Sequence, residues 1–508
     1  MPDVYDAYKP LRNYLRNTNL ITSLGALRWY INYFQFADNQ PPPSDMRVDP
    51  IFYKKGMIFL PPWHVAVLAR ELIINSRPSS LMLLHDLRQW NKLANAINML
   101  KAIDEYIAQS YVDQGNVLHL ISKIFPHQQF VWQENKPNIQ TMTRYYYIYR
   151  NPKVRKIFEK YFGLSVEAHF ILGMMAWANY KNFLGIEYPP TFDTRFKLTN
   201  ADYELFLKHY ALTLEELQKR LQDPQERKMG PEFFYYFDSL RRYPMILTKI
   251  NGKESHICPV STYLYWRVTD GIYYELINEK GFDQGIGDSF KEYIGEVMNE
   301  QVYSRSIKIL DADTYVQPSL PKSDWIVING DRAAFVECKA KRMTLTARTD
   351  VNFSPATEEQ LKKLAESVIQ CYLAINDARK KAYTELGSVK KIYPIVVTME
   401  NWYILGDIMT KLEAKVKEVA SQKGVDHKHI VDEPYLVLSS QEFETVAILL
   451  RSTSLKDIIE PFLTDKKYFG WQFGTYLFND FTKENSTFHQ LFKGNLVESV
   501  LDQLKSTT

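Results

Sequence analysis

The chain has 508 residues, of which 45% are hydrophobic and 24% are charged, and this ordinary globular balance predicts roughly two to four domains. A formal net charge of +3 is too small to indicate or to exclude a nucleic-acid partner, because only a local basic patch would matter. Three cysteines exclude a disulfide framework. Without a signal-peptide pattern or a run of roughly 18 apolar residues, we expect a cytoplasmic protein with no membrane contact.

Residues 1–275 are predicted to form a mainly helical region. Thr213 and Glu216 stand in capping-box positions, which predict the start of a helix. The functions expected of this region are regulation and the binding of a partner or a substrate. Apolar residues at three- and four-residue spacing predict further helices at 63–76, 93–109 and 165–180.

Helices and strands alternate in the second half of the chain. An amphipathic helix at 287–303 precedes two strand-like runs, SDWIVI and AAFVEC, which the hairpin signal Asn329-Gly330 separates. A long helix at 358–383 and a β-branched strand at 392–399 follow. This order predicts an α+β or α/β fold with a mixed central sheet flanked by helices. The chain is accordingly divided into a helical region at 1–275, a sheet-containing core at 276–410 and a small C-terminal α/β elaboration at 411–508.

Three charged residues lie at the ends of the two runs that form the predicted hairpin. Asp324 begins the first run, and Glu337 and Lys339 end the second. Because side chains alternate between the faces of a strand, any even-numbered loop places all three on one face, whereas an odd-numbered loop separates them. A two-residue loop at 329–330 sets Asp324 diagonal to Glu337, and a four-residue loop at 329–332 sets the two acids directly opposite each other.

This arrangement of two acids and a lysine predicts a particular chemistry. Two carboxylates at cross-strand distance repel unless one is protonated or a cation binds between them. Hard oxygen ligands in an incomplete protein cage favour Mg²⁺, for which Mn²⁺ substitutes. A metal held by Asp324 and Glu337 would polarise a phosphoryl oxygen, while Lys339 holds or deprotonates the attacking water. The residues therefore predict hydrolysis of phosphodiester bonds.

The same residues resemble the PD-(D/E)xK nuclease superfamily, which has a restriction-endonuclease-like fold. Asp324, three residues after Pro321, looks like the PD acid of that family, and Glu337-Cys338-Lys339 matches its E-x-K element. The resemblance covers about 281–400 and implies a metal-dependent nuclease, with DNA as the expected substrate. A helical region ahead of such a core is similar to the layout of prokaryotic defence nucleases, which implies a role against foreign DNA.

The resemblance also implies two assisting residues on the flanking helices. In that family the helix before the hairpin often adds a glutamate to the metal site, which implies Glu292 as a third metal ligand, with Glu296 one turn later as the alternative. The helix after the E-x-K element often brings a glutamine near the site, which implies Gln370. The catalytic set expected from sequence is therefore Asp324, Glu337, Lys339, Glu292 and Gln370.

Other interpretations stay open at this point. The three charged residues also fit an ordinary hairpin with an exposed ion pair. The function alternatives are an inactive nuclease-fold component that binds nucleic acid or protein, and a nuclease that cleaves RNA. A homo-oligomer and a partner protein bound through the helical region remain open.

Five further features of the sequence have a functional and a structural interpretation. The aromatic and basic run 144–156 is typical of single-strand binders, but a helix core with a charged rim is favoured. His427–His429 is predicted to be a polar loop, since no cysteine or further histidine lies nearby. The basic stretches 339–342 and 379–383 fit either phosphate contacts or a solvated surface. Cys338 is predicted to pack as an apolar residue on the face opposite to its neighbours.

Overall fold

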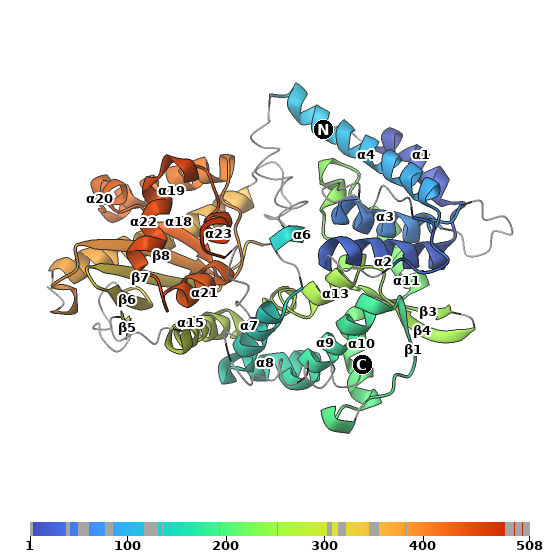
Figure 1. Cartoon of the computed structure of the whole chain (residues 1–508), viewed down its shortest axis with the longest axis horizontal. Coiled ribbons are helices and arrows are strands. Elements are labelled where there is room, and N and C mark those ends of the chain that lie inside the picture. The colour runs from blue at the N-terminus through green and yellow to red at the C-terminus, as the bar shows by residue number, and fades with distance from the viewer. Residues whose placement is uncertain are drawn as a thin grey trace. The chain divides into compact units, whose positions relative to one another are not determined.

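The chain divides into two compact units in the computed structural model (Figure 1). Unit 1 comprises Met1–Asn138 and Phe158–Glu275, and unit 2 comprises Ile139–Ile157 and Leu276–Thr508. Unit 2 thus includes a short segment from the N-terminal half of the chain, and residues 411–508 fall in the same unit as 276–410. The structure describes residues 4–36, 41–48, 60–76, 85–115, 131–134, 137–192, 194–250, 252–301, 307–312, 322–344, 355–380, 384–482, 492 and 500.

Unit 1 is mainly helical, as its apolar spacing predicts. The capping box is confirmed: Thr213 Oγ1 accepts a hydrogen bond from the Glu216 backbone N–H (3.2 Å), and Glu216 Oε2 accepts one from the Thr213 N–H (2.9 Å). The three helices predicted from spacing are α3, α4 and α9. The helices are α1 (Tyr5–Leu15), α2 (Leu20–Phe36), α3 (Pro62–Asn75), α4 (Trp90–Asp113), α6 (Val131–Glu134), α9 (Val166–Asn182), α10 (Asn200–Tyr210), α11 (Leu214–Gln222), α12 (Ser239–Arg242) and α13 (Ser261–Arg267), while α8 (Pro152–Phe162) and α14 (Ile272–Leu276) cross between the units.

Unit 1 also contains a small sheet that the sequence does not predict. Its strand order is β1-β4-β3-β2, in which β2 and β3 run parallel and the other pairs antiparallel. Its strands are three to six residues long, and a segment such as KESHI shows no alternation of apolar and polar residues. The strands are β1 (Gly185–Glu187), β2 (Ala211–Thr213), β3 (Met245–Ile250) and β4 (Lys253–Ile257).

Unit 2 is built on a five-stranded mixed sheet of order β5-β6-β7-β8-β9. The pairs β5/β6 and β6/β7 are antiparallel, whereas β7/β8 and β8/β9 are parallel, so the α+β class is confirmed. The order contains the predicted helix, hairpin, helix and strand, with β5 as an unpredicted addition. The elements are α7 (Ile139–Arg150), α15 (Phe282–Gln301), β5 (Ile307–Asp311), β6 (Trp325–Asn329), β7 (Arg332–Lys339), α18 (Pro355–Lys380), β8 (Lys391–Thr398), α19 (Asp407–Lys423), α20 (His427–Asp432), β9 (Leu436–Ser439), α21 (Ser440–Leu449), α22 (Leu455–Thr464) and α23 (Phe473–Leu477).

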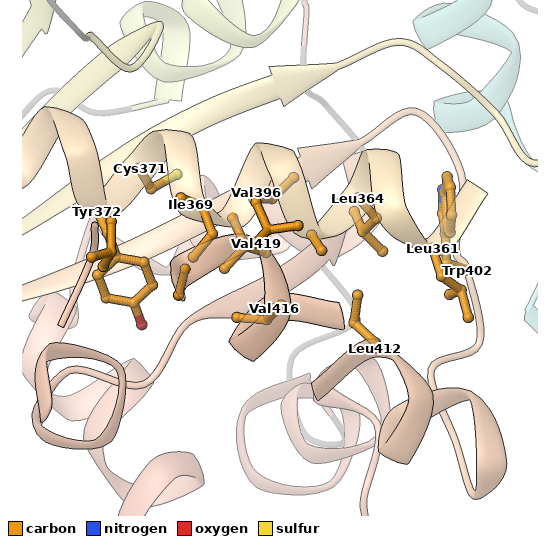
Figure 2. Packing of buried hydrophobic residues seen from close by; sticks show 14 of the residues in the cluster. Leu361, Leu364, Ile369, Cys371, Tyr372, Val396, Trp402, Leu412, Val416 and Val419 are labelled. Carbon is orange, nitrogen blue, oxygen red and sulfur yellow. The ribbon is translucent and has the colours of Figure 1, made fainter. Parts of the chain in front are cut away.

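The two faces of this sheet are covered by different helices. On one face, Ile326 and Phe335 pack against Ile375 of α18. Figure 2 shows the continuation of this core, in which side chains of α18 and α19 meet around Val396 of β8. On the other face, α15 approaches Trp325 so closely that a Cβ added at Gly295 would lie 2.2 Å from the indole ring. Only glycine permits this approach, which fixes α15 against the start of β6.

Helix α7 is joined to unit 2 by a buried carboxylate. Glu444 of α21 is fully buried, and its Oε1 accepts hydrogen bonds from Arg144 Nε (2.5 Å) and from the Tyr293 hydroxyl (2.8 Å). Its Oε2 accepts from Arg144 Nη2 (2.8 Å) and from Gln140 Nε2 (2.6 Å). A buried charge with four donors is well satisfied, which explains why residues 139–157 cluster with unit 2. Tyr145 and Tyr149 are buried, so residues 144–150 form helix core, as favoured above.

Two further findings complete the fold. The predicted polar loop at His427–His429 is wrong, because these residues open helix α20, whose first turn Asp426 caps by accepting a hydrogen bond from the Lys428 N–H (2.8 Å). Over the described residues, none of the helices combines the length and the apolar character that crossing a membrane requires.

Candidate active site

The register of the β6–β7 hairpin brings the two acids face to face. Asn329 pairs with Arg332 and Trp325 pairs with Val336, so Asp324, the residue before β6, comes next to Glu337 and accepts a hydrogen bond from the Cys338 N–H. The loop is even-numbered, as the convergence of the acids requires. It consists of Gly330 and Asp331, so the predicted loop at 329–330 is displaced by one residue. Gly330 has φ +63°, a left-handed conformation that favours glycine.

Glu337 and Lys339 share the face of the sheet that α18 covers, and Asp324 lies beside them at the start of β6. Side chains alternate along β7, so Glu337 lies on the same face as Phe335. Asp324 lies just before β6, and its carboxylate reaches the β7 backbone at Cys338. Phe335 packs against α18. Lys339 continues this face two residues after Glu337. Cys338 lies on the opposite face and is buried, as predicted.

Glu337 is a buried carboxylate with one unsatisfied oxygen. Its side chain is 3% exposed, and its Oε1 lies 2.5 Å from Lys339 Nζ. Its Oε2 is buried and has no hydrogen-bond partner among the described residues. Burial, and secondly the charge of Asp324, raise the pKa of Glu337 to about 7. An oxygen in this state is suited to bind a proton or a cation.

Asp324 is held in place from two sides. Its Oδ2 accepts a hydrogen bond from the backbone N–H of Cys338 (2.8 Å), which ties the carboxylate to the neighbouring strand. Its Oδ1 lies 3.8 Å from Nζ of Lys291 in α15. The same ammonium lies 3.3 Å from Oδ1 of Asp311, the last residue of β5. The sequence reasoning missed Lys291 and Asp311, although Asp311 ends the strand-like run IKILD in the same way that Glu337 ends its own run.

Lys339 connects the acids to α18. Its Nζ donates a hydrogen bond to Gln370 Oε1 (3.4 Å), and Gln370 Nε2 donates to the Lys322 carbonyl (3.2 Å). The structure thus brings together Gln370 and Lys339. Burial alone would lower the pKa of Lys339, but the charge of Glu337 outweighs it and holds the pKa above its usual value. Lys339 is therefore an ammonium at neutral pH.

The structure does not bring the glutamates of α15 into contact with the acids. Glu292 Oε2 accepts a hydrogen bond from Asn151 Nδ2 (2.6 Å), and its Oε1 pairs with Lys153 Nζ (3.0 Å). Glu296 Oε2 lies 3.7 Å from Arg150 Nη2. Lys291 is instead the α15 side chain that reaches Asp324.

The two basic stretches and Pro321 are described only in part. Arg342, in the basic stretch 339–342, is 1% exposed and contacts the Tyr145 hydroxyl and Glu400, so its guanidinium does not face an incoming phosphate. In the stretch 379–383, Arg379 pairs with Glu433, and residues 381–383 lie outside the described part. Pro321 also lies outside it.

Two carboxylates of the site are available as metal ligands. In the part of the chain that the structure describes, no group of three or more His, Cys, Asp or Glu side chains is arranged to hold a metal ion. Asp324 and Glu337 are a pair of hard oxygen donors, and the unsatisfied Oε2 of Glu337 fits a cation. Two carboxylates, with water completing the coordination, are typical of Mg²⁺ sites.

Comparisons with known proteins do not assign the chain to a family. No family model matches the chain, and no curated protein or solved structure is significantly similar to it.

Proposed function

We propose that this protein is a divalent-cation-dependent nuclease that hydrolyses phosphodiester bonds, with DNA as the substrate and endonucleolytic cleavage as the mode. The observation that carries the proposal is the state of Glu337, a buried carboxylate with an unsatisfied oxygen, opposite Asp324 and beside Lys339. A hairpin that needed only charged ends would leave such an acid in solvent. The order of α15, the hairpin, α18 and β8 also supports the resemblance to the PD-(D/E)xK superfamily.

Asp324 and Glu337 would hold Mg²⁺ or Mn²⁺ in this proposal. The backbone N–H of Cys338 orients Asp324, and burial fixes Glu337, so both ligands are preorganised. A bound divalent cation would polarise the phosphoryl oxygen and neutralise the charge that develops during in-line displacement. Glu292 does not belong to this set, because its two oxygens contact Asn151 and Lys153.

Lys339 would orient the attacking water or a phosphate oxygen. As an ammonium it donates hydrogen bonds and adds positive charge where the pentavalent transition state gains negative charge. Gln370 accepts from Lys339 and is itself held by the Lys322 carbonyl, so Gln370 restricts the direction in which the ammonium points. Gln370 is a positioning residue in this scheme.

The choice of DNA, and of defence against foreign DNA, rests on the resemblance alone. The metal chemistry of the site acts on either nucleic-acid backbone, so RNA is the alternative substrate. In the same proposal, the helical unit 1 serves regulation, partner binding or substrate selection, and a homo-oligomer would supply two sites for cutting a duplex.

Cleavage assays with two site variants test the proposal. Wild-type protein is expected to cut DNA in Mg²⁺ or Mn²⁺ but not in EDTA, and Glu337→Gln and Lys339→Met are expected to lower the rate by at least about 100-fold. The matched control is Glu413→Gln with Lys415→Met, since Glu413-Ala414-Lys415 is an E-x-K triplet on the surface of α19.

The outcomes separate the function classes. Equal cleavage by the wild type and both site variants would reject the proposed site. Binding of nucleic acid without turnover, unaffected by EDTA, would identify an inactive nuclease-fold component. Cleavage of RNA but not of DNA, with the same loss in the site variants, would keep the chemistry and change the substrate.

A further inference from the structure

Lys291 contacts one acid of the proposed site and a second acid outside it. Its Nζ lies 3.8 Å from Asp324 Oδ1 and 3.3 Å from Asp311 Oδ1. The Lys291 side chain is 18% exposed, less than either carboxylate, so solvent screens this cation only partly. The proposed nuclease chemistry assigns no role to Lys291 or to Asp311.

Trp325 fixes the position of Lys291. The indole Nε1 of Trp325 donates a hydrogen bond to the Lys291 carbonyl (3.1 Å), and the ammonium lies 5.9 Å from the centre of the Trp325 ring. Gly295 lets α15 approach that ring. The side chain of Lys291 is therefore directed to the start of β6, where Asp324 lies.

The two oxygens of Asp324 have different partners. Oδ2 accepts the Cys338 N–H, and Oδ1 faces the ammonium of Lys291. A cation that binds between Asp324 and Glu337 therefore meets the Lys291 ammonium at Oδ1 of Asp324, whereas Glu337 offers the unsatisfied Oε2 and pairs with Lys339 only through Oε1. Two like charges that share one carboxylate oxygen weaken each other's binding.

We propose that Lys291 competes with the divalent cation for Asp324, and that Asp311 holds the ammonium of Lys291 when the cation is bound. This inference rests on the function proposed above and adds to it the control of metal affinity. Lys291 stabilises the charge of Asp324 in the absence of a metal. Asp311, already the nearer acid, holds the ammonium when the metal displaces it, and so limits the loss of metal affinity. The two residues thus affect metal affinity in opposite directions.

Direct metal binding tests the competition without any cleavage assay. Titration of the full chain with Mn²⁺ and with Mg²⁺ is followed by calorimetry at low salt and fixed pH, without nucleic acid. Lys291→Met is expected to lower the Kd on the order of tenfold, because a unit charge within about 4 Å of the ligand is lost. Asp311→Asn is expected to raise the Kd about fivefold, because Lys291 then remains on Asp324.

A double variant separates this mechanism from a general effect of charge. When Lys291 is already Met, Asp311→Asn is expected to change the Kd by less than about twofold, so the two substitutions are not additive. Lys291→Arg keeps the charge and is expected to give a Kd nearer to that of the wild type than Lys291→Met does. The control is Lys308→Met, which removes an exposed lysine three residues from Asp311 on the same strand.

The result also shows which proposal fails. A wild-type Kd in Lys291→Met, additive effects in the double variant, or an equal gain in affinity from Lys308→Met would overturn the competition. If Glu337→Gln abolishes Mn²⁺ binding while Lys291→Met changes nothing, the proposed nuclease site stands and only this inference fails. If the wild type binds no divalent cation, both fail.

Discussion

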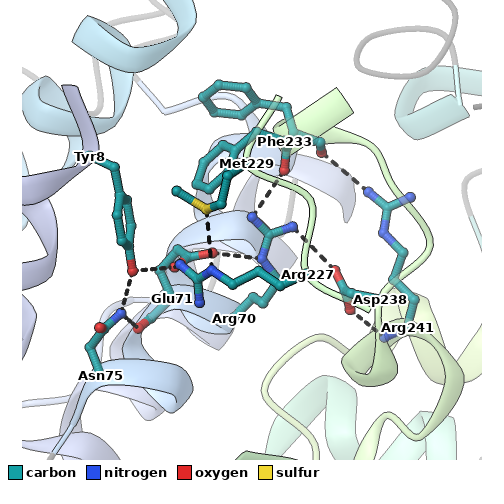
Figure 3. Close-up of polar contacts among 10 residues, drawn as sticks. Tyr8, Arg70, Glu71, Asn75, Arg227, Met229, Phe233, Asp238 and Arg241 are labelled. Carbon is teal, nitrogen blue, oxygen red and sulfur yellow. Dashed lines mark hydrogen bonds and ion pairs between the residues drawn. The ribbon is translucent and has the colours of Figure 1, made fainter. Parts of the chain in front are cut away.

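Glu71 of unit 1 and Glu337 of unit 2 are both buried, but only Glu71 has hydrogen-bond donors on both carboxylate oxygens. Glu71 of α3 is fully buried, and Figure 3 shows the groups around it. Its Oε1 accepts a hydrogen bond from Arg70 Nε (2.8 Å), and its Oε2 accepts from the Tyr8 hydroxyl (2.7 Å) and from Arg227 Nη2 (2.9 Å). Glu337 has Lys339 on one oxygen, and its other oxygen is unsatisfied.

The pKa values of the two acids follow from these partners. Burial alone would raise the pKa of Glu71, but the charges of Arg70 and Arg227 outweigh it, so the pKa lies below its ordinary value. Burial and Asp324 raise the pKa of Glu337 to about 7. Removing a buried acid whose oxygens both have partners destabilises the fold, because its partners lose their counter-charge. A buried acid that lacks a partner is suited to bind a ligand. The comparison therefore indicates a structural role for Glu71 and supports the metal-binding role proposed for Glu337.

The largest predicted effect is the loss of stability on removing Glu71. Glu71→Ala leaves the buried Arg70 and the half-buried Arg227 without this carboxylate, and breaking such a network costs about 3–5 kcal/mol. Arg70 keeps contacts to Asp238 Oδ2 (3.3 Å) and to the Phe233 carbonyl (3.0 Å), which limits the loss. Because two units need not unfold together, hydrogen exchange of the α3 amides in urea measures the effect.

An exposed acid in the same unit provides the control. Glu215→Ala, in the first turn of α11, is expected to change the stability of unit 1 by no more than about 0.5 kcal/mol. Equal losses from Glu71→Ala and Glu215→Ala would show that the buried network does not hold unit 1 together.

Glu337→Gln is predicted to stabilise unit 2 at high pH. The pKa of Glu337 is about 7 in the fold against an ordinary value of 4.5, so the folded state binds the proton more tightly. The stability of unit 2 therefore falls as pH rises from 4.5 to 7. At about 1.36 kcal/mol per pKa unit, the difference between 7 and 4.5 gives a cost above pH 7 of at most about 3–4 kcal/mol. Glutamine removes it.

Denaturation of both proteins at pH 4.5, 7 and 8.5 measures this gain. The two are expected to be equally stable at the lowest pH, and Glu337→Gln is expected to be the more stable at the highest. Glu71 has the opposite sign, because its lowered pKa contributes stability that is lost as pH falls below 4.5. A pH profile of unit 2 that is the same with Glu and with Gln at position 337 would contradict the prediction.

The sequence predicts the parts of this site that depend on strand alternation. Asp324, Glu337 and Lys339 converge because the loop is even-numbered, and that follows from the period of a strand. Gln370 came from the resemblance, and the structure brings it to Lys339.

The missed parts depend on tertiary packing. Lys291 reaches Asp324 because α15 approaches Trp325 at Gly295, and no local pattern encodes this approach. The pairing of Arg144 with Glu444 joins residues 300 positions apart, so the place of α7 in unit 2 could not be predicted from local periodicity.

The smallest predicted effect compares one local motif in the two units. Thr213 and Glu216 form an exposed capping box at α11, whereas Ser439 and Glu442 form a buried one at α21. Thr213→Ala is expected to cost about 1 kcal/mol, because water replaces the lost hydrogen bonds. Ser439→Ala is expected to cost about 2 kcal/mol, since Glu442 then loses the Ser439 hydroxyl (2.8 Å) in a place that water does not reach. Hydrogen exchange of the first amides of α11 and α21 measures both costs. Equal costs would mean that burial does not strengthen a cap, and would weaken the same argument for Glu71.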